Sequence, residues 1–272
     1  MPKNLIQQDL SPDALVTAIE DNAVESIRTW SAWPELLLQD DPELLWTLTD
    51  IPFGPLNCAV RPRLTADTAD AAITASRSRA SERGVPVSWW LGPAPTPDDL
   101  ETRLEGAGFA KIDEMVGMGV DLRRLEDPLT RPPGLTVEEV TDSKHLRRWC
   151  FLMGPAHDFP PQALAAWHRC HHAIGYGPGA PWRHFLALVN GVPVATASLF
   201  FGAGVASIAN VGTVVDLRGR GIGRFISAHP LNLALDAGYR IGTLWASPKG
   251  APMYRRLGFR PYCLSPVYLW KP

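Results

Sequence analysis

The stretch Arg218-Gly219-Arg220-Gly221-Ile222-Gly223 decides the fold of this chain. A mostly apolar run, 209–215, leads into it and an apolar-periodic segment follows, which predicts a strand, a glycine-rich turn and a helix. Glycines in such a turn let main-chain N–H groups approach anionic oxygens, and the helix N-terminus adds partial positive charge. Arg224 adds a third arginine to the segment. The stretch therefore predicts a site for a phosphate or pyrophosphate group.

Two plainer interpretations of these residues stay open: a glycine-rich turn with solvated arginines, and an arginine–glycine patch for nucleic acid. The formal net charge of −2 opposes the second, because nucleic-acid and anionic membrane surfaces need a basic excess. A Walker loop would end in Gly-Lys-Ser/Thr, and a Rossmann fingerprint would lie in the first strand–helix turn. We therefore expect a local anion site, with neither nucleic acid nor membrane as a partner.

The length of 272 residues suits two domains of ordinary size, and 46% hydrophobic residues can form a substantial core. The N-terminal segment has no apolar stretch of the kind that directs secretion, and no run approaches about 18 apolar residues. The cysteines lack CxxC spacing, so we expect reduced thiols in a cytoplasmic protein; they are Cys58, Cys150, Cys170 and Cys263.

The segment Asp127–Gly134 is the best linker candidate, because it holds three prolines and a glycine. It divides the chain into 1–130 and 131–272. The second part predicts an antiparallel meander followed by a strand, the glycine loop, a helix and further strands, an α/β order. The expected elements are strands at 135–140, 182–189, 193–200, 205–215, 240–246 and 262–270, and helices at 143–153, 160–174, 222–237 and 251–257.

The first part repeats the order of the second without the glycine loop. A strand at 87–93, a helix around 97–104, the dipeptide Gly108-Phe109 and a strand at 115–122 match the order of 243–270, which contains Gly258-Phe259. A strand at 57–60 and a helix at 66–80 would precede them. We therefore expect a diverged copy of the second half.

Arg-x-x-Gly-x-Gly after the fourth strand of such a meander resembles the GNAT superfamily of N-acetyltransferases. The resemblance continues in Ser247-x-x-Gly250-x-x-Met253-Tyr254-x-x-Leu257-Gly258-Phe259, where small residues and a tyrosine precede Gly-Phe. It covers about 131–272, and the first half is similar to the degenerate copy of two-copy members. The resemblance implies a mixed, mostly antiparallel sheet flanked by helices, in two tandem GNAT-like domains of which the first is degenerate.

The resemblance also implies acetyl-CoA as co-substrate and assigns residues to it. Val211 and Thr213 would pair through their main chain with the pantetheine arm, in a gap between two splayed strands. Ser247 stands where the family often has asparagine, and it would contact CoA. Tyr254 matches the tyrosine beside the thioester sulfur. The pyrophosphate would lie on the loop and helix N-terminus formed by Arg218, Gly219, Arg220, Gly221, Ile222, Gly223 and Arg224.

The acceptor pocket would be shaped by His157 and Asp158, with Asn210 on the strand before the loop. Many GNAT enzymes carry a carboxylate on that strand as a base, but 207–213 has none. We therefore expect the proton to leave through ordered water, relayed to His157, Asp158 or a helix histidine. His168 and His172 share a helix face at i, i+4 spacing, yet they lack an evident third ligand, so we expect no metal.

The resemblance therefore implies an enzyme that transfers an acetyl group from acetyl-CoA directly to a primary amine of a small molecule or peptide, without a covalent acyl-enzyme. The alternative is a non-catalytic sensor or regulatory module that binds CoA or acyl-CoA. Tyr254 favours catalysis, because a pure binding protein has little need of a phenol beside the sulfur. Self-association into a homodimer stays open.

Overall fold

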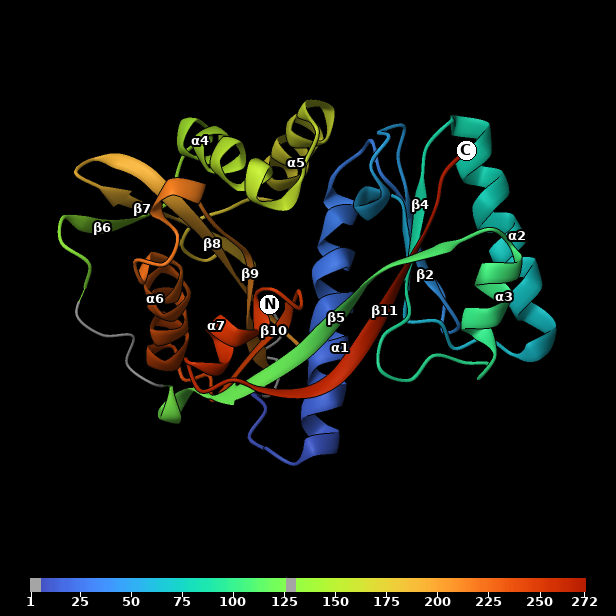
Figure 1. The fold of residues 1–272 in the computed structure, drawn as a ribbon, viewed down its shortest axis with the longest axis horizontal. Coiled ribbons are helices and arrows are strands. Elements are labelled where there is room, and N and C mark those ends of the chain that lie inside the picture. Colours follow the sequence, from blue (N-terminus) through green and yellow to red (C-terminus); the bar gives the residue numbers. More distant parts are fainter. Residues whose placement is uncertain (1–5, 126–130) are drawn as a thin grey trace.

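The computed structural model describes residues 6–125 and 131–272. Within them an eleven-stranded sheet runs in the order β1-β2-β3-β4-β11-β5-β10-β9-β8-β7-β6 (Figure 1). The strands are β1 (Leu37–Asp40), β2 (Leu45–Leu48), β3 (Cys58–Val60), β4 (Val87–Trp90), β5 (Ala110–Asp121), β6 (Leu135–Glu139), β7 (Trp182–Val189), β8 (Val192–Gly202), β9 (Val205–Thr213), β10 (Ile241–Ala246) and β11 (Arg260–Trp270). The helices are α1 (Pro12–Arg28), α2 (Ala66–Arg83), α3 (Leu100–Gly106), α4 (Ser143–Met153), α5 (Pro161–Ile174), α6 (Ile222–Asp236) and α7 (Ala251–Arg255), with short 3₁₀ segments η1 (Thr29–Ala32), η2 (Gly54–Leu56), η3 (Leu122–Arg124), η4 (Gly154–His157) and η5 (Val215–Leu217).

The expected mixed architecture with a mostly antiparallel sheet is confirmed. β3 and β4 pair in parallel, as do β9 and β10, and the other neighbouring strands are antiparallel. The hairpin of β7 and β8 turns at Asn190 and Gly191, which both have positive φ, as a tight two-residue turn requires. Part of the expected linker, 127–130, lies outside the described residues. No helix of the described ranges is long and apolar enough to cross a membrane.

Alternating side chains place β7 between two cores. Phe185 belongs to the cluster that includes Ile222 and Ile226 of α6, whereas Leu186 belongs to the cluster that includes Trp149 of α4. Successive residues of a strand point to opposite faces, so α6 covers one face of this part of the sheet and α4 with α5 covers the other (Figure 1). The second cluster also includes residues of α1 and η1, which lie between the two halves.

The two halves exchange their last strands. β5 is the last strand of the first half, yet it pairs along β10 of the second half. β11 ends the second half, yet it pairs with β4 of the first. The two strands also pair with each other, and they run side by side across the middle of the molecule in green and red (Figure 1). The division at residue 130 therefore separates the sequence without separating the sheet.

This exchange predicts that residues 131–272 alone do not fold stably. The fragment lacks β5, whose Met118 and Val120 are buried in the same core as Leu244 and Ile226. Removing them exposes one edge of β10 and opens the core, which costs several kcal/mol for two large side chains, roughly 2–5 each. We expect low soluble yield and no cooperative thermal transition by circular dichroism.

The control for this prediction is the full-length chain cleaved near residue 130, in which both pieces remain present. It should keep its cooperative transition, and co-expression of 1–125 should rescue the fragment. A fragment 131–272 that melts as sharply as the intact chain would show that β5 is dispensable.

Candidate active site

β9 and β10 separate after a short stretch of pairing. Their parallel register covers Ala206 with Gly242 and Ser207 with Thr243, after which β10 pairs with β5 on its other side. β9 continues to Thr213 and pairs with β8 alone. Main-chain groups on one edge of β9 are therefore left without a strand partner in the described structure. Such an edge suits an extended ligand that hydrogen-bonds like an added strand.

Val211 and Thr213 lie in this unpaired stretch. The N–H of Val214 donates to the carbonyl of Val194 on β8 at 2.9 Å, so by alternation the main-chain groups of Thr213 face the gap. The Arg218 Nε donates to the Thr213 carbonyl at 3.0 Å. The glycine loop is thereby tied to the end of the gap, and a ligand in the gap would meet the loop directly.

The glycine loop leaves open space in front of α6. Gly219 and Gly221 have φ values of 79° and 80°, and a Cβ at either position would meet no atom within 4 Å. No side chain caps the first turn of α6 within the described residues, so the N–H groups of Ile222 to Arg224 point into that space. Arg218 and Arg220 are exposed beside it. Uncapped N–H groups with positive charge nearby suit a pyrophosphate.

The first turn of α6 packs against α7. A Cβ at Gly223 would lie 3.1 Å from the sulfur of Met253 and 3.5 Å from Oγ1 of Thr213, so only glycine fits there without displacement. The Arg224 guanidinium donates to the carbonyl of Arg256 at 3.1 Å. Gly223 and Arg224 therefore hold α7 in place, whatever their main-chain amides bind.

Tyr254 on α7 is buried beside this junction, 9% exposed, in the core under α6. Its ring meets Phe259 edge to face at 5.9 Å. Burial raises the pKa of its phenol well above the ordinary value, and the hydroxyl of Ser227 opposes this only in part. The phenol is therefore protonated at every pH at which the protein would be assayed.

Ser247 stabilises the turn before α7. Its Oγ accepts from the N–H of Gly250 at 3.2 Å, and its carbonyl accepts from Gly250 and Ala251 at 2.9 and 3.0 Å. These bonds form the turn that starts α7. The hydroxyl can still donate its own hydrogen, because it acts here only as an acceptor.

Asn210 and His157 lie on the opposite face of the sheet, the one covered by α4 and α5. Asn210 sits at an irregularity of β9 with a φ of 54°; its carbonyl accepts from the hydroxyl of Thr196 at 2.9 Å. The imidazole of His157 lies over Gly212 of the same strand, because a Cβ at Gly212 would be 3.8 Å from its Nε2. Desolvation lowers the pKa of His157, while the main chain of Val211 and the carboxylate of Asp158 partly oppose the shift.

The helix histidines divide into two groups. His168 and His172 stack with ring centroids 6.1 Å apart, and the described part of the chain contains no cluster of three metal-ligating side chains. His171, another histidine of the same helix, is fully buried and hydrogen-bonds to His184. Its position four residues after Trp167, on the apolar face of α5, is the sequence signal that could have indicated this burial.

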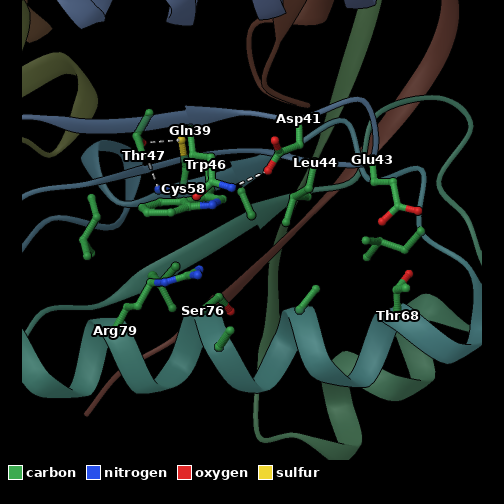
Figure 2. Close-up of a pocket in the computed structure, with 16 residues that line it drawn as sticks. Gln39, Asp41, Glu43, Leu44, Trp46, Thr47, Cys58, Thr68, Ser76 and Arg79 are labelled. Atoms are coloured by element: carbon green, nitrogen blue, oxygen red, sulfur yellow. Dashed lines mark hydrogen bonds between the residues drawn. The ribbon is translucent and has the colours of Figure 1, made fainter.

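A cleft of about 200 Å³ lies elsewhere, between α2 and strands of the first half (Figure 2). There the guanidinium of Arg79 covers the ring of Trp46 at 4.3 Å. The corresponding strands, β3 and β4, pair along all of β3, and Thr65 caps α2 by accepting from the N–H of Thr68 at 3.2 Å. This cleft therefore lacks both the open strand edge and the free helix N-terminus of the second half.

Comparison with known proteins agrees with this geometry. Residues 145–259 match the family model of the acetyltransferase (GNAT) family. A GCN5-related N-acetyltransferase from Kribbella flavida is similar in structure, with a TM-score of 0.68 and 20% identity over 93% of this chain and 95% of that one. One from Sphaerobacter thermophilus has a TM-score of 0.63 and 17% identity over 100% and 96% of the two chains.

A tandem GNAT protein from the clavulanic acid biosynthesis pathway is also similar, with a TM-score of 0.60 and 15% identity over 98% of this chain and 96% of that one. No curated protein sequence matches the chain significantly. The family's reaction is acetyl transfer from acetyl-CoA. The chain therefore carries an acetyltransferase domain of the GNAT family at residues 145–259, within a fold that it shares with GCN5-related N-acetyltransferases over nearly its whole length.

Proposed function

We propose that this protein is an N-acetyltransferase that moves an acetyl group from acetyl-CoA to a primary amine of a small molecule or peptide. The observation that supports this best is the early end of β9–β10 pairing, which leaves an open strand edge leading to the uncapped N-terminus of α6. An extended pantetheine arm and a pyrophosphate have the shape and hydrogen-bonding groups that such a site needs.

In this proposal the second half, 131–272, holds the co-substrate. The main chain of Val211 and Thr213 pairs with the pantetheine, and Ser247 donates its free hydroxyl hydrogen to the same molecule. The amides between Gly219 and Arg224, with the charges of Arg218 and Arg220, bind the pyrophosphate. The first half, 1–130, binds no CoA, since its equivalent strands are fully paired and its equivalent helix is capped.

The reaction in this proposal is a direct displacement. The amine nitrogen attacks the thioester carbonyl carbon, a C–N bond forms, the C–S bond breaks, and the sulfur leaves with the bonding electron pair. Tyr254 supplies a proton to that sulfur as negative charge develops on it, and its phenolate, which burial disfavours, then takes a proton back from water. The amine loses its own proton to water, with His157, which lies over Gly212 of β9, as a group for a relay, since β9 carries no carboxylate.

The pH dependence of kcat/KM should follow the acceptor. With water as the route, the rising limb should move with the pKa of the amine when an aliphatic amine is replaced by a less basic aminoacyl amide. His157 as an obligatory base would behave differently. Its pKa is lowered from 6.5, so its neutral form would already be complete near that pH, and the limb would stay below about 6.5 for both amines.

The test of the function is a panel of primary amines incubated with acetyl-CoA, with detection of the released thiol and of the acetylated amine by mass spectrometry. Thiol release that depends on an amine supports the enzyme. Binding of acetyl-CoA without amine-dependent release over the whole panel would favour the sensor. If acetyl-CoA does not bind at all, both the enzyme and the sensor are ruled out.

A further inference from the structure

A buried chain of hydrogen bonds connects α5 to the open strand. His171 Nδ1 lies 3.1 Å from His184 Nε2, and His184 Nδ1 lies 2.8 Å from the hydroxyl of Ser198. The amide nitrogen of Asn210 donates to the same hydroxyl at 3.2 Å. His171, His184 and Ser198 are completely buried, whereas Asn210 is half-buried at the edge of the gap. This series of hydrogen bonds thus joins α5, β7, β8 and β9, and it ends beside the proposed acetyl-transfer site.

The two imidazoles are neutral in this environment. Trp149 lies 4.3 Å from the ring of His184, and Trp167 lies 4.8 Å from the ring of His171. Burial lowers the pKa of His171 to about 3 and that of His184 well below its ordinary value. Both rings are therefore neutral at neutral pH, and this proposal gives neither of them the role of a base. Each can donate through one nitrogen and accept through the other.

The direction of the chain follows from its two ends. The Asn210 amide donates, so the Ser198 hydroxyl is free to donate to His184 Nδ1, and His184 Nε2–H donates to His171 Nδ1. This leaves the Nε2–H of His171, which has no hydrogen-bond partner within the described residues. That group is surrounded by indole rings, against whose faces an N–H is weakly favourable. If the hydrogen bonds ran in the opposite direction, His171 Nε2 would carry no hydrogen, and its lone pair would be buried without a donor.

We propose that His171, His184 and Ser198 are positioning residues that fix the side-chain amide of Asn210, so that its carbonyl oxygen accepts an N–H of the attacking amine. The inference rests on the proposed function. Within the described residues no group donates to Oδ1 of Asn210, and its main-chain carbonyl is held separately by Thr196. The backbone and the side chain of Asn210 are therefore both fixed, and its Oδ1 is left free to accept a hydrogen bond.

This arrangement distinguishes classes of amine. A neutral primary amine has two N–H groups, so one can bind Asn210 while the other proton leaves to water. A secondary amine has a single N–H, and it would lose the Asn210 contact when that proton leaves. We therefore expect a primary amine to react faster than its N-methyl derivative, and Asn210 to account for much of the difference.

The first experiment needs no acceptor. In ¹⁵N-labelled full-length protein, His184 Nδ1 and His171 Nδ1 should have the shifts of unprotonated nitrogens, and both rings should stay neutral from pH 8 to 5. Asn210 should give a single pair of slowly exchanging amide signals, which Ser198→Ala broadens and exposes to exchange. Ser265→Ala, a buried serine bonded to Gly92 at the other half, should leave them unchanged. Protonated Nδ1 atoms would reverse the direction of the chain and overturn the proposal.

The second experiment is a double-mutant cycle with the best amine of the panel. Ser198→Ala and Asn210→Gly should each raise KM for the amine about tenfold, with KM for acetyl-CoA unchanged; a hydrogen bond to a polar group is worth about that much. Glycine suits the positive φ at position 210, so the strand should survive. Because Ser198 acts only through the amide, the double variant should equal Asn210→Gly alone.

The outcomes separate this inference from the function on which it rests. A further tenfold loss on adding Ser198→Ala to Asn210→Gly would show that Ser198 supports the fold in general, and the inference would be wrong. An unchanged ratio between the primary amine and its N-methyl derivative in Asn210→Gly would contradict it as well. If no amine is acetylated, the proposed function fails in the panel, and the nuclear magnetic resonance experiment alone still decides whether the chain fixes Asn210.

Discussion

Gly221→Val is expected to abolish measurable binding of acetyl-CoA while the protein stays folded. Gly221 has a φ of 80° and precedes the first turn of α6. Valine resists that conformation by about 1–2 kcal/mol, and its side chain would fill the space where phosphate oxygens must approach the helix N–H groups. Isothermal titration calorimetry on the full-length chain gives the measurement, and the wild type should bind one acetyl-CoA per chain.

Gly84→Val is the matched control. Gly84 ends α2 with a φ of 63°, and a Cβ there also meets nothing within 4 Å, so the backbone penalty is similar. It lies in the half that lacks the glycine loop. We expect a comparable drop in thermal stability with unchanged affinity for acetyl-CoA. Wild-type affinity in a folded Gly221→Val variant would show that the pyrophosphate does not lie on this loop, and two acetyl-CoA per wild-type chain would refute the proposal for the first half.

Tyr254→Phe is expected to lower kcat by about 10²-fold or more, within the usual range for loss of a general acid. Phenylalanine keeps the ring and its edge-to-face packing on Phe259, so the core should be preserved. The variant removes only the hydroxyl that would protonate the departing sulfur. KM for acetyl-CoA should change little, because the interaction is made mainly in the transition state. Steady-state kinetics with the best amine of the panel give both constants.

The control is Tyr268→Phe on β11. Its hydroxyl donates to Glu101 at 2.7 Å, and its ring is buried in the core formed with α2 and α3. The substitution therefore removes a comparable phenol far from the glycine loop, and kcat should stay at the wild-type value. A Tyr254→Phe enzyme as fast as wild type would leave Tyr254 with a packing role alone.

The sequence predicts the second half well because its signals are local. Asn190-Gly191 specifies a hairpin turn, and the glycine spacing before Ile222 specifies a loop and a helix start; both elements are present. The apolar spacing of Leu15, Ala18 and Ile19 also indicates a helix, α1, which our sequence analysis did not assign. β1 and β2 are short strands whose existence depends on pairing with β3, and they were not assigned either.

The remaining features depend on contacts between distant segments. The residues of β5 and β11 do not indicate which strand each will pair with. Alternation of apolar and polar side chains determines which face of a strand is buried, but it does not determine the neighbouring strand. The distance between His171 and His184 depends on how α5 packs on the sheet, which spacing along the chain does not specify. Within the candidate site, the loop and Tyr254 could therefore be found from sequence, whereas the anchoring of Asn210 could not.

The exchange of β5 and β11 has a consequence for biosynthesis. β11 is translated after the other ten strands of the described sheet, yet it completes the sheet of the half that is translated first. While the ribosome makes the residues between β5 and β11, the edge of β4 in the nascent first half has no partner strand. During the same interval β5 cannot pair with β10 until β10 has been made. Unpaired strand edges invite association with other chains, so this interval is when aggregation competes most with folding. The first half cannot reach its native state co-translationally as an independent unit, and both halves are completed together once β11 has left the exit tunnel.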